Sequence, residues 1–406
     1  MIDVKMVREN LAEAKKSMSR RGADIDFEKL LKLDDERKSL QKRIEELRAK
    51  QNELSKLKER SAKASEIKTM LKDLEPQLLQ AEENYKIAAV KVPNLVFHDV
   101  PSGKDENDNK IIKKVGEIKL QKGKDHADLG VALDIIDIER AVKVSGARFY
   151  YLKNQAVELE FALIRYALDI IKKESFAPVI TPILIKEEIA WGSGYFEATN
   201  DDAYHMKKDP LIAIGTSEQS ILAMHANETL KSLPKRYVGF STCLRREAGS
   251  YGKDTKGILR GHQFDKLEMF SFCHPDNSKA EHDLIISLQE KIMQGLELPY
   301  QKVALCGGDM GAPSAKTIDI ETWMPGEEKY RETHSSSNCT DFQARRLNIR
   351  FKDESGSGFA HTLNGTAVAI GRTIIAIIEN YQQVNGSIKI PKVLHKYLDF
   401  EEISLK

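Results

Sequence analysis

Residues 245–270, RREAGSYGKDTKGILRGHQFDKLEMF, combine two arginines and a glutamate with a glycine-rich basic loop and a row of alternating aromatic and charged residues. The segments 240–247 and 260–272 alternate enough to form the two strands of a hairpin. Successive side chains of a strand point to opposite faces. One face of the second strand should therefore carry Arg260, His262, Phe264, Lys266, Glu268 and Phe270. Arg245 and Glu247 share a face of the first strand, which indicates a functional surface, with an ordinary salt-bridged sheet face as the alternative.

The spacing along this expected strand suits one class of ligand. Phe264 and Glu268 are separated by about 13 Å, at about 3.3 Å per residue. That span is comparable to the reach from an adenine ring to the far end of an aminoacyl group joined through one phosphate. The glycine-rich segments 252–257 (GKDTKG) and 307–311 (GGDMG) match neither G-x-x-x-x-G-K-[ST] nor G-x-G-x-x-G before a helix. If the chain binds ATP, it uses another scaffold.

The composition gives no sign of a membrane or a disulfide framework. The 406 residues include 63 Lys and Arg against 62 Asp and Glu, so the net charge of +1 offers no global argument for nucleic acid or an acidic membrane surface. No apolar run approaches the length of a membrane span, and residues 1–10 lack a signal-peptide core, so we expect a cytoplasmic protein. The cysteines have no C-x-x-C pair and are expected to be buried thiols rather than zinc ligands: Cys243, Cys273, Cys306 and Cys339.

Two heptad series near the N-terminus predict an antiparallel helical hairpin over about residues 27–92. The first series is Leu33, Leu40, Leu47 and Leu54. The second is Ile67, Leu71, Leu74, Leu78, Ala81, Tyr85, Ala88 and Val92. A polar break near 59–65 separates them, and each helix of about 30 residues would extend about 45 Å. We expect a bend at Pro76. The charge pattern alone leaves a plain dimerisation coil as an equal alternative.

The rest of the chain predicts an α+β domain. A short helix and turn over 1–26 would pack at the base of the hairpin, and residues 92–110, rich in proline and polar side chains, indicate a linker. We therefore divide the chain into an arm (1–100), a linker (101–115) and a second domain (116–406). The second domain mixes helices with hairpin-type strands and has no regular βαβ rhythm, so we expect an antiparallel sheet flanked by helices.

Five segments of the chain resemble, in order and spacing, those of class II aminoacyl-tRNA synthetases in the form found in seryl-tRNA synthetases. FAPVITPILI (176–185) resembles motif 1, the hairpin with RRE and RGHQF (245–264) resembles motif 2, and NGTAVAIGRTIIAIIENYQ (364–382) resembles motif 3. GTSEQ (215–219) resembles the amino-acid loop, and YRETHSSSNCTDFQARR (330–346) resembles the metal and ATP segment. The long N-terminal hairpin completes the architecture of the family, an N-terminal antiparallel coiled-coil hairpin followed by a class II catalytic domain.

The resemblance implies an ATP site with Arg245, Arg372 and Glu332 as catalytic residues. Arg245 would contact the α-phosphate and the amino-acid carboxylate, Arg372 the γ-phosphate and one face of adenine, and Phe264 would stack on adenine. Glu332 and Ser335 would hold Mg²⁺ against phosphate oxygens, and no zinc is implied. The implied ATP-binding residues are Arg245, Arg246, Glu247, Arg260, Phe264, Glu332, Thr333, His334, Ser335 and Arg372.

Two positions depart from the family pattern. Thr333-His334 stands where the family usually has Ile-Ser, and we expect His334 to be an exposed or tolerated variant, with altered nucleotide contacts as the alternative. Gly261 replaces a branched aliphatic residue and could loosen its strand.

The resemblance also implies a serine pocket in which hydrogen bonds to the hydroxyl reject alanine and the pocket volume rejects threonine. Glu268 would take the ammonium group, and Thr366 would bind the hydroxyl. The serine-binding residues implied are Thr216, Glu218, Arg245, Glu268, Asn364 and Thr366.

The activity implied is ATP-dependent formation of seryl-adenylate and transfer of serine to tRNA(Ser), with tRNA(Sec) as a second substrate. The helical arm would contact the tRNA through its basic residues, and two subunits would pair through motif 1 as a homodimer. Two alternatives are a synthetase-like ligase that loads a carrier protein, which would lack the arm and bind zinc, and a degenerate paralogue, which would have lost the motif residues. The basic residues of the arm include Arg43, Arg48, Lys56, Lys58, Arg60 and Lys63.

Overall fold

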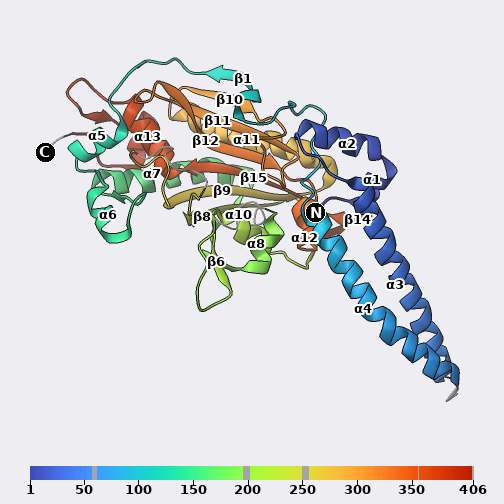
Figure 1. The fold of residues 1–406 in the computed structure, drawn as a ribbon. Helices are drawn as coiled ribbons and strands as arrows, with labels where there is room; N and C mark the ends of the chain where they lie inside the picture. Colours follow the sequence, from blue (N-terminus) through green and yellow to red (C-terminus); the bar gives the residue numbers. More distant parts are fainter. Residues whose placement is uncertain (57–61, 195–201, 249–255, 355, 405–406) are drawn as a thin grey trace.

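The computed structural model describes residues 1–56, 62–194, 202–248, 256–354 and 356–404. Two long helices, α3 (Phe27–Lys56) and α4 (Ala62–Val90), lie side by side and project from the sheet-containing body as the predicted arm (Figure 1). α4 continues through Pro76 as a single helix and includes part of the polar break that the sequence indicated near 59–65. The remainder of that break, with Lys58 and Arg60, lies outside the described residues.

The heptad positions form the seam between the two helices. The apolar cluster between them consists of Leu40, Ile44, Leu47, Ile67, Met70, Leu71, Leu74 and Leu78. Ile44 and Met70 belong to this cluster although the heptad series omitted them, whereas Leu33 and Leu54 are only partly buried. The predicted register is therefore correct in the middle of the arm, where the two helices bury their facing sides.

The base of the arm is a small core of its own. Residues 1–26 form two short helices, α1 (Val4–Glu9) and α2 (Leu11–Arg20), rather than one helix and a turn. Their apolar side chains pack with both ends of the hairpin and with one residue from the second domain. The buried residues of this arm-base cluster are Ile2, Val4, Val7, Ala14, Met18, Phe27, Leu30, Ala89, Val92 and Phe342.

The second domain is built on an eight-stranded sheet in the order β1-β10-β11-β12-β15-β9-β8-β4. All neighbouring strands are antiparallel except β4 and β8, which confirms the expected sheet type. The strands are β1 (Lys110–Val115), β4 (Ala177–Ile180), β8 (Lys235–Leu244), β9 (Gln263–Cys273), β10 (Tyr300–Ala304), β11 (Lys316–Met324), β12 (Lys329–Asn338) and β15 (His361–Ala369). β1 is an edge strand, so the predicted linker 101–115 ends inside the sheet rather than before it.

Short strands complete the sheets around this core. They are β2 (Ile136–Asp137), β3 (Tyr151–Leu152), β5 (Leu184–Lys186), β6 (Leu211–Ala213), β7 (Thr229–Leu230), β13 (Arg350–Asp353), β14 (Gly356–Phe359), β16 (Ile388–Lys389) and β17 (Glu402–Ile403). The predicted charged hairpin is β8 and β9, whose inner ends at Leu244 and Gln263 stop short of the expected ends at 247 and 260, while β8 begins earlier than the expected 240. Residues 249–255 of the connecting loop lie outside the described part of the chain.

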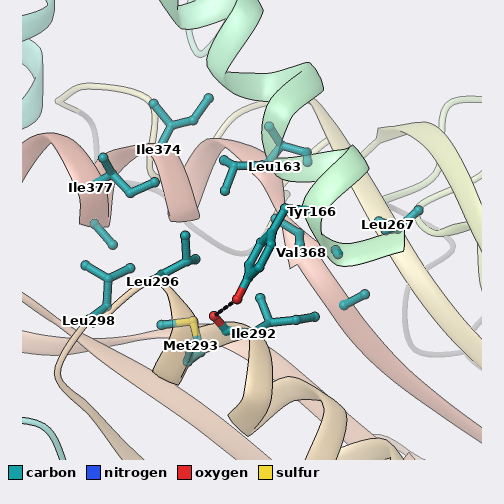
Figure 2. Packing of buried hydrophobic residues seen from close by; sticks show 14 of the residues in the cluster. Leu163, Tyr166, Leu267, Ile292, Met293, Leu296, Leu298, Val368, Ile374 and Ile377 are labelled. Carbon is teal, nitrogen blue, oxygen red and sulfur yellow. Dashed lines mark hydrogen bonds between the residues drawn. The ribbon is translucent and has the colours of Figure 1, made fainter. Parts of the chain in front are cut away.

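Helices pack on both faces of the large sheet (Figure 1). Three of them, α7 (Gln155–Ile171), α11 (Ser278–Gly295) and α13 (Ile370–Asn380), cover one face, and α8 (Glu187–Ser193) and α10 (Ser217–Ala223) lie on the other side near β8 and β9. Figure 2 shows the core under the first group, where Leu163 and Ile374 pack with Leu267 and the Tyr166 hydroxyl donates to the Ile292 carbonyl at 3.1 Å. α5 (His126–Ala132) packs against α13, α12 (Phe342–Arg346) packs against α8 and β15, and α6 (Glu139–Ser145) follows β2.

A buried arginine joins the arm to the sheet domain. Arg21 follows α2, and its guanidinium donates to carbonyls of Asn94, Gly307, Met310, Gly311 and Ser314. The glycines of the GGDMG segment permit this close approach, because a Cβ on Gly307 would lie 2.3 Å from the Arg20 carbonyl oxygen. Gly307 therefore serves the packing of the arm base against the sheet domain.

Two expectations from composition can be compared with the structure. All four cysteines are buried and unpaired, as predicted. Within the described part of the chain, no helix combines the length and the apolar character needed to cross a membrane.

We expect Arg21→Met to lower the free energy of unfolding by about 3 kcal/mol or more, because several buried carbonyl groups would lose their donor. Arg21→Lys should cost less, since an ammonium group retains three donors. Thermal unfolding followed by circular dichroism measures both. Arg48→Lys is the matched control, because the Arg48 side chain is 60% exposed and its pair with Glu75 should contribute less than about 1 kcal/mol. Equal losses in melting temperature at positions 21 and 48 would contradict this account.

Candidate functional site

Two adjoining cavities form one cleft on the face of the sheet opposite α7, α11 and α13. The inner pocket has a volume of ≈ 320 Å³ and is lined by residues of α10, β8, β9, β12 and β15. The outer pocket has a volume of ≈ 170 Å³ and lies toward the start of α13. Both pockets are lined by Arg245, Lys266, Glu332 and Thr366, so these four side chains lie at the junction.

The register of β9 sets the row of side chains along the cleft. Leu267 and Met269 point into the core under α7, α11 and α13, so their neighbours Lys266 and Glu268 point to the cleft. Glu268 lies opposite Thr366 of β15. The alternation predicted from the sequence is therefore correct within β9, although Arg260 and His262 precede the strand.

The floor of the inner pocket is a buried polar cluster. Lys266 Nζ lies 2.6 Å from Glu268 Oε2, and the Thr366 hydroxyl donates to the same carboxylate oxygen at 3.2 Å. Both Lys266 and Glu268 are less than a tenth exposed, so this pair is largely removed from water. The sequence placed Lys266 on the correct face but did not identify it as a site residue, and strand alternation was the signal that could have done so.

A second carboxylate enters the inner pocket from α10. Thr216 caps this helix, and Glu218 in its first turn is buried. Burial raises the pKa of Glu218 to about 7 against the opposing effect of a hydrogen bond from Gln343, whose Nε2 donates to Glu218 Oε1 at 2.8 Å. The carboxylate of Glu268 raises this pKa further, whereas Lys266 and the amide of Asn364 lower it. Two of the carboxylates of the pocket, Glu218 and Glu268, therefore lie near the single ammonium group of Lys266.

Arg245 follows β8 at the junction of the two pockets. Its Nε and Nη2 donate to the Gly215 carbonyl at 3.2 and 3.1 Å, and its guanidinium carbon lies 5.2 Å from the centre of the Phe264 ring. The backbone amide of Arg245 donates to the His262 carbonyl at 2.9 Å, which closes the end of the hairpin. The remaining guanidinium surface faces the cleft.

The outer pocket carries two arginine–glutamate pairs. Arg260 Nη1 lies 2.7 Å from Glu247 Oε2. Arg372, in the first turn of α13, lies 3.2 Å from Glu332 Oε2 and also donates to the Glu332 carbonyl at 2.7 Å. Burial works to raise the pKa of Glu332, but the charges of Arg372, Arg245 and Lys266 lower it below the ordinary value. A cation at a helix N-terminus is disfavoured by the dipole, and this ion pair compensates for it.

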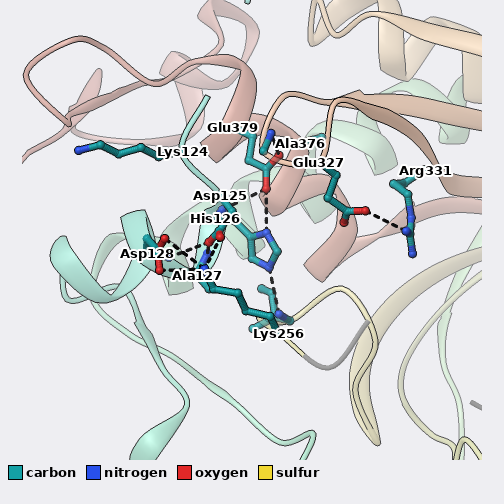
Figure 3. A network of polar contacts seen from close by, with 12 residues as sticks. Lys124, Asp125, His126, Ala127, Asp128, Lys256, Glu327, Arg331, Ala376 and Glu379 are labelled. Carbon is teal, nitrogen blue, oxygen red and sulfur yellow. Dashed lines mark hydrogen bonds and ion pairs between the residues drawn. The ribbon is translucent and has the colours of Figure 1, made fainter. Parts of the chain in front are cut away.

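A polar network behind the outer pocket fixes the return of the hairpin loop (Figure 3). His126 Nδ1 lies 2.8 Å from Glu379 Oε1, and the backbone amide of Ile258 donates to His126 Nε2 at 3.1 Å. Gly257 has φ +78°, and a Cβ there would lie 2.0 Å from His126 Nε2. Lys256 pairs with Asp125 and Asp128 at the start of α5. The segment that leads to Arg260 is therefore anchored to α5 and α13.

A row of carboxylates lies beside Ser335 on β11 and β12. Burial, and then the charge of Glu332, raise the pKa of Asp319 well above its ordinary value, and the pKa of Glu321 is raised for the same two reasons. Asp319 Oδ1 has no hydrogen-bond partner among the described residues. These hard oxygen donors fit Mg²⁺, although no cluster of three metal-ligating side chains exists within the described residues that could hold an ion unaided. A magnesium ion here would need oxygen ligands from a substrate.

The expectation that His334 is exposed is wrong. His334 is fully buried, and its Nε2 donates to the Ala367 carbonyl at 3.1 Å while Nδ1 lies 2.9 Å from the Thr333 hydroxyl. The pairing of β12 with β11 skips Thr333, and the pairing of β15 with β9 skips Ala367. Each of these residues is therefore the extra residue of a β-bulge, and the hydrogen bonds of His334 connect the two bulges. Burial lowers the pKa of His334 to about 4. The Thr333-His334 departure therefore stabilises the two strands from behind the cleft.

The cleft brings together most of the residues singled out from the sequence. The inner pocket is lined by the predicted residues Thr216, Glu218, Arg245, Glu268, Glu332, Ser335, Asn364 and Thr366. The outer pocket is lined by the predicted residues Arg245, Glu247, Arg260, Phe264, Glu332, Thr333 and Arg372. Arg246 and His334 line neither pocket, whereas Gly261 lines the outer pocket just before β9. The prediction missed Lys266, Gln219 and Ser337, and the last two lie within the segments 215–219 and 330–346 that resemble family motifs.

Comparisons with known proteins cover the whole chain. Residues 1–96 match the seryl-tRNA synthetase N-terminal domain, and residues 201–381 match the tRNA synthetase class II core domain (G, H, P, S and T). The chain is 44% identical over 424 residues to a serine–tRNA ligase of Borreliella afzelii and 45% identical over 425 residues to one of Dictyoglomus thermophilum. Each alignment covers 100% of both chains.

A solved structure agrees with these relatives. The crystal structure of seryl-tRNA synthetase from Pyrococcus horikoshii complexed with ATP superimposes with a TM-score of 0.91 at 41% identity, and the match covers 100% of both chains. The agreement includes the helical arm as well as the sheet domain, because no part of either chain is left out. The chain therefore belongs to the seryl-tRNA synthetase family of class II aminoacyl-tRNA synthetases.

Proposed function

We propose that this member of an ATP-dependent synthetase family activates L-serine as seryl-adenylate in the described cleft and transfers serine to the terminal adenosine of tRNA(Ser), and also of tRNA(Sec). The observation that carries the proposal is the single cleft in which the inner pocket, with Glu218, Glu268 and Thr366, meets the outer pocket at Arg245. The inner pocket would hold serine and the outer pocket the nucleotide.

The first step joins two anions, and the cleft supplies the charges that this requires. A carboxylate oxygen of serine attacks the α-phosphorus of ATP, the bond to the β-phosphate oxygen breaks, and pyrophosphate leaves. Arg245 and Lys266 lie where the two pockets meet, so they would reduce the repulsion between carboxylate and phosphate and stabilise charge on the reacting phosphoryl group. No general base is needed, because the attacking carboxylate is already ionised.

The outer pocket suits the remainder of the nucleotide. Phe264 offers a ring to the adenine, Arg260 and Arg372 offer guanidinium groups to the phosphates, and Glu247 offers an acceptor to the adenine amino group. Mg²⁺ held by Glu332 and Ser335 together with phosphate oxygens would neutralise part of the triphosphate charge. In the second step the hydroxyl of the terminal adenosine attacks the carbonyl carbon of seryl-adenylate, and AMP leaves.

The inner pocket suits serine in size and in polarity. The hydroxyl of Thr366, the amide of Asn364 and the carboxylate of Glu268 are all available to a small hydroxyl-bearing side chain. Alanine would leave these buried groups without a partner, at about 1–3 kcal/mol for each. Threonine would need space for an additional methyl group.

We further propose that the protein works in the cytoplasm as a homodimer, with the arm holding the tRNA. The segment that resembles motif 1 and the neighbouring α7 carry exposed apolar side chains, which suits an interface between subunits: Phe161, Ile180, Ile183 and Leu184. The arm carries exposed basic residues along its two antiparallel helices, α3 and α4, which suits contacts with phosphates of a folded RNA. Neither surface is part of the cleft.

Amino-acid-dependent exchange of pyrophosphate into ATP tests the substrate. We expect serine to support exchange with a kcat/KM about 100-fold or more above that of alanine, because alanine leaves the polar groups of the inner pocket unsatisfied. Threonine and glycine complete the panel. Exchange with alanine but not with serine would overturn the assignment of the inner pocket.

A variant with a shortened arm distinguishes adenylate formation from the transfer of serine to tRNA. Removing residues 41–77 and joining Leu40 to Leu78 through a glycine-rich linker leaves the arm-base cluster intact. Pyrophosphate exchange should stay within about threefold of the full chain, whereas tRNA charging should fall by about 100-fold or more because phosphate contacts are lost. The double variant Arg43→Gln, Lys63→Gln is the control in the full chain, and it should weaken charging less. An equal loss of exchange and charging would mean that the arm supports the core structurally.

The homodimer can be tested at one exposed residue. Ile180 is 85% exposed in β4, and Ile180→Asp should convert a dimer into monomers because a charge would be buried in an apolar interface. Size-exclusion chromatography with light scattering gives the mass. Val384→Asp introduces the same charge at another fully exposed apolar residue and should leave the mass unchanged. A monomeric unmodified protein, or a dimeric Ile180→Asp variant, would refute this interface.

A further inference from the structure

Gln343 lies behind the inner pocket with all of its amide contacts satisfied. It is fully buried in α12 and is not a lining residue of either pocket. Its Nε2 donates to Glu218 Oε1 at 2.8 Å and to the Ser193 carbonyl at 2.9 Å, and its Oε1 accepts from the Thr362 hydroxyl at 2.7 Å. The amide of this glutamine has one favourable orientation. If it were flipped, its oxygen would face the carboxylate oxygen of Glu218 and the carbonyl oxygen of Ser193, and neither of these can donate a hydrogen bond.

The contact bears on a buried carboxylate whose hydrogen bonds come from neutral groups. Glu268 has Lys266 at 2.6 Å, whereas Glu218 receives its hydrogen bonds from the neutral amides of Gln343 and Asn364. The charge of an ionised Glu218 is therefore left for a cationic group of the substrate to pair with. The ammonium group of an amino acid is a cation of the required size and charge.

α12 is held in place from the side of the arm. Phe342, adjacent to Gln343, belongs to the arm-base cluster, and its carbonyl accepts from the Met1 ammonium at 2.6 Å. Arg345 pairs with Asp3 of the arm base and with Asp341, and Arg346 donates to the Trp191 carbonyl at 2.9 Å. The position of Gln343 is thus set by contacts that do not involve the pocket.

We propose that Gln343 is a positioning residue for amino-acid recognition, which orients the carboxylate of Glu218 toward the ammonium group of the substrate. The inference rests on the proposed function, since it takes the inner pocket to be the amino-acid site. Gln343 acts through Glu218 and does not touch the substrate. The same hydrogen bond favours the ionised form of Glu218, which is the form that can bind an ammonium group.

The substitution Gln343→Met tests this with a side chain of similar length and no donor. In pyrophosphate exchange the KM for serine should rise by about 10-fold or more, as expected for loss of a hydrogen bond to a charged group, while the KM for ATP should change by less than about twofold. A parallel rise in both KM values, or an unchanged KM for serine, would overturn the proposal.

The pH profile gives a readout that a purely structural role would not move. The pKa of Glu218 is about 7, so kcat/KM for serine should fall as the pH falls through that value and the carboxylate becomes protonated. Gln343 lowers this pKa, so its removal should move the acid limb to higher pH. Glu268, Lys266 and Asn364 face the same carboxylate and are unchanged in the variant. An acid limb at the same pH in both proteins would refute the proposed role.

Two variants keep the test decisive. Arg345→Met removes the ion pair of α12 with Asp3 of the arm base and leaves the contacts of Phe342 and Arg346 that hold the helix, so it should lower the melting temperature and leave the KM for serine unchanged. If Gln343→Met does not fold, Gln343→Glu carries the test, because it keeps the length of the side chain, replaces the donor to Glu218 with a carboxylate oxygen and should raise the KM for serine alone. An unchanged KM for serine in that folded variant would overturn the proposal. An unmodified protein that does not use serine would instead overturn the proposed function.

Discussion

The register of three antiparallel strands positions the cleft. β9 pairs with β8 on one side and with β15 on the other, and this places Phe264, Lys266 and Glu268 in one row with Thr366 opposite Glu268. A shift of one residue would turn this row into the core and bring Leu267 and Met269 into the cleft. The apolar packing under α7, α11 and α13 thus fixes the polar surface on the other face.

Charge balance gives the cleft a second constraint. Arg260, Arg372 and Lys266 each contact a carboxylate, whereas Arg245 contacts a backbone carbonyl. Charged groups removed from water need such partners. A substrate that carries both phosphates and an ammonium group would exchange partners with these pairs, so its arrival need not leave an isolated charge.

Heptads and alternation predicted the helical hairpin and the antiparallel sheet, because these patterns depend on neighbours along the chain. Most of the site residues that the family resemblance implied line the cleft. His334 was misplaced because its burial depends on two bulges in different strands, and Thr333 and Ala367 carry no local mark of a bulge. β1 was taken for a linker because an exposed edge strand lacks the apolar alternation of a half-buried one. Gln343 was overlooked because its role depends on contacts with residues 125 and 150 positions away.

α12 contacts both the arm base and a carboxylate of the inner pocket, which limits engineering by domain exchange. One side of this helix contributes Phe342 to the arm-base cluster, and another brings Gln343 to Glu218. A chimaera that received a foreign N-terminal half would therefore place new neighbours against α12. Grafts that retain residues 1–30 and 89–94 from the recipient should preserve the contacts that position α12. Only the distal part of the hairpin can therefore be exchanged as a unit.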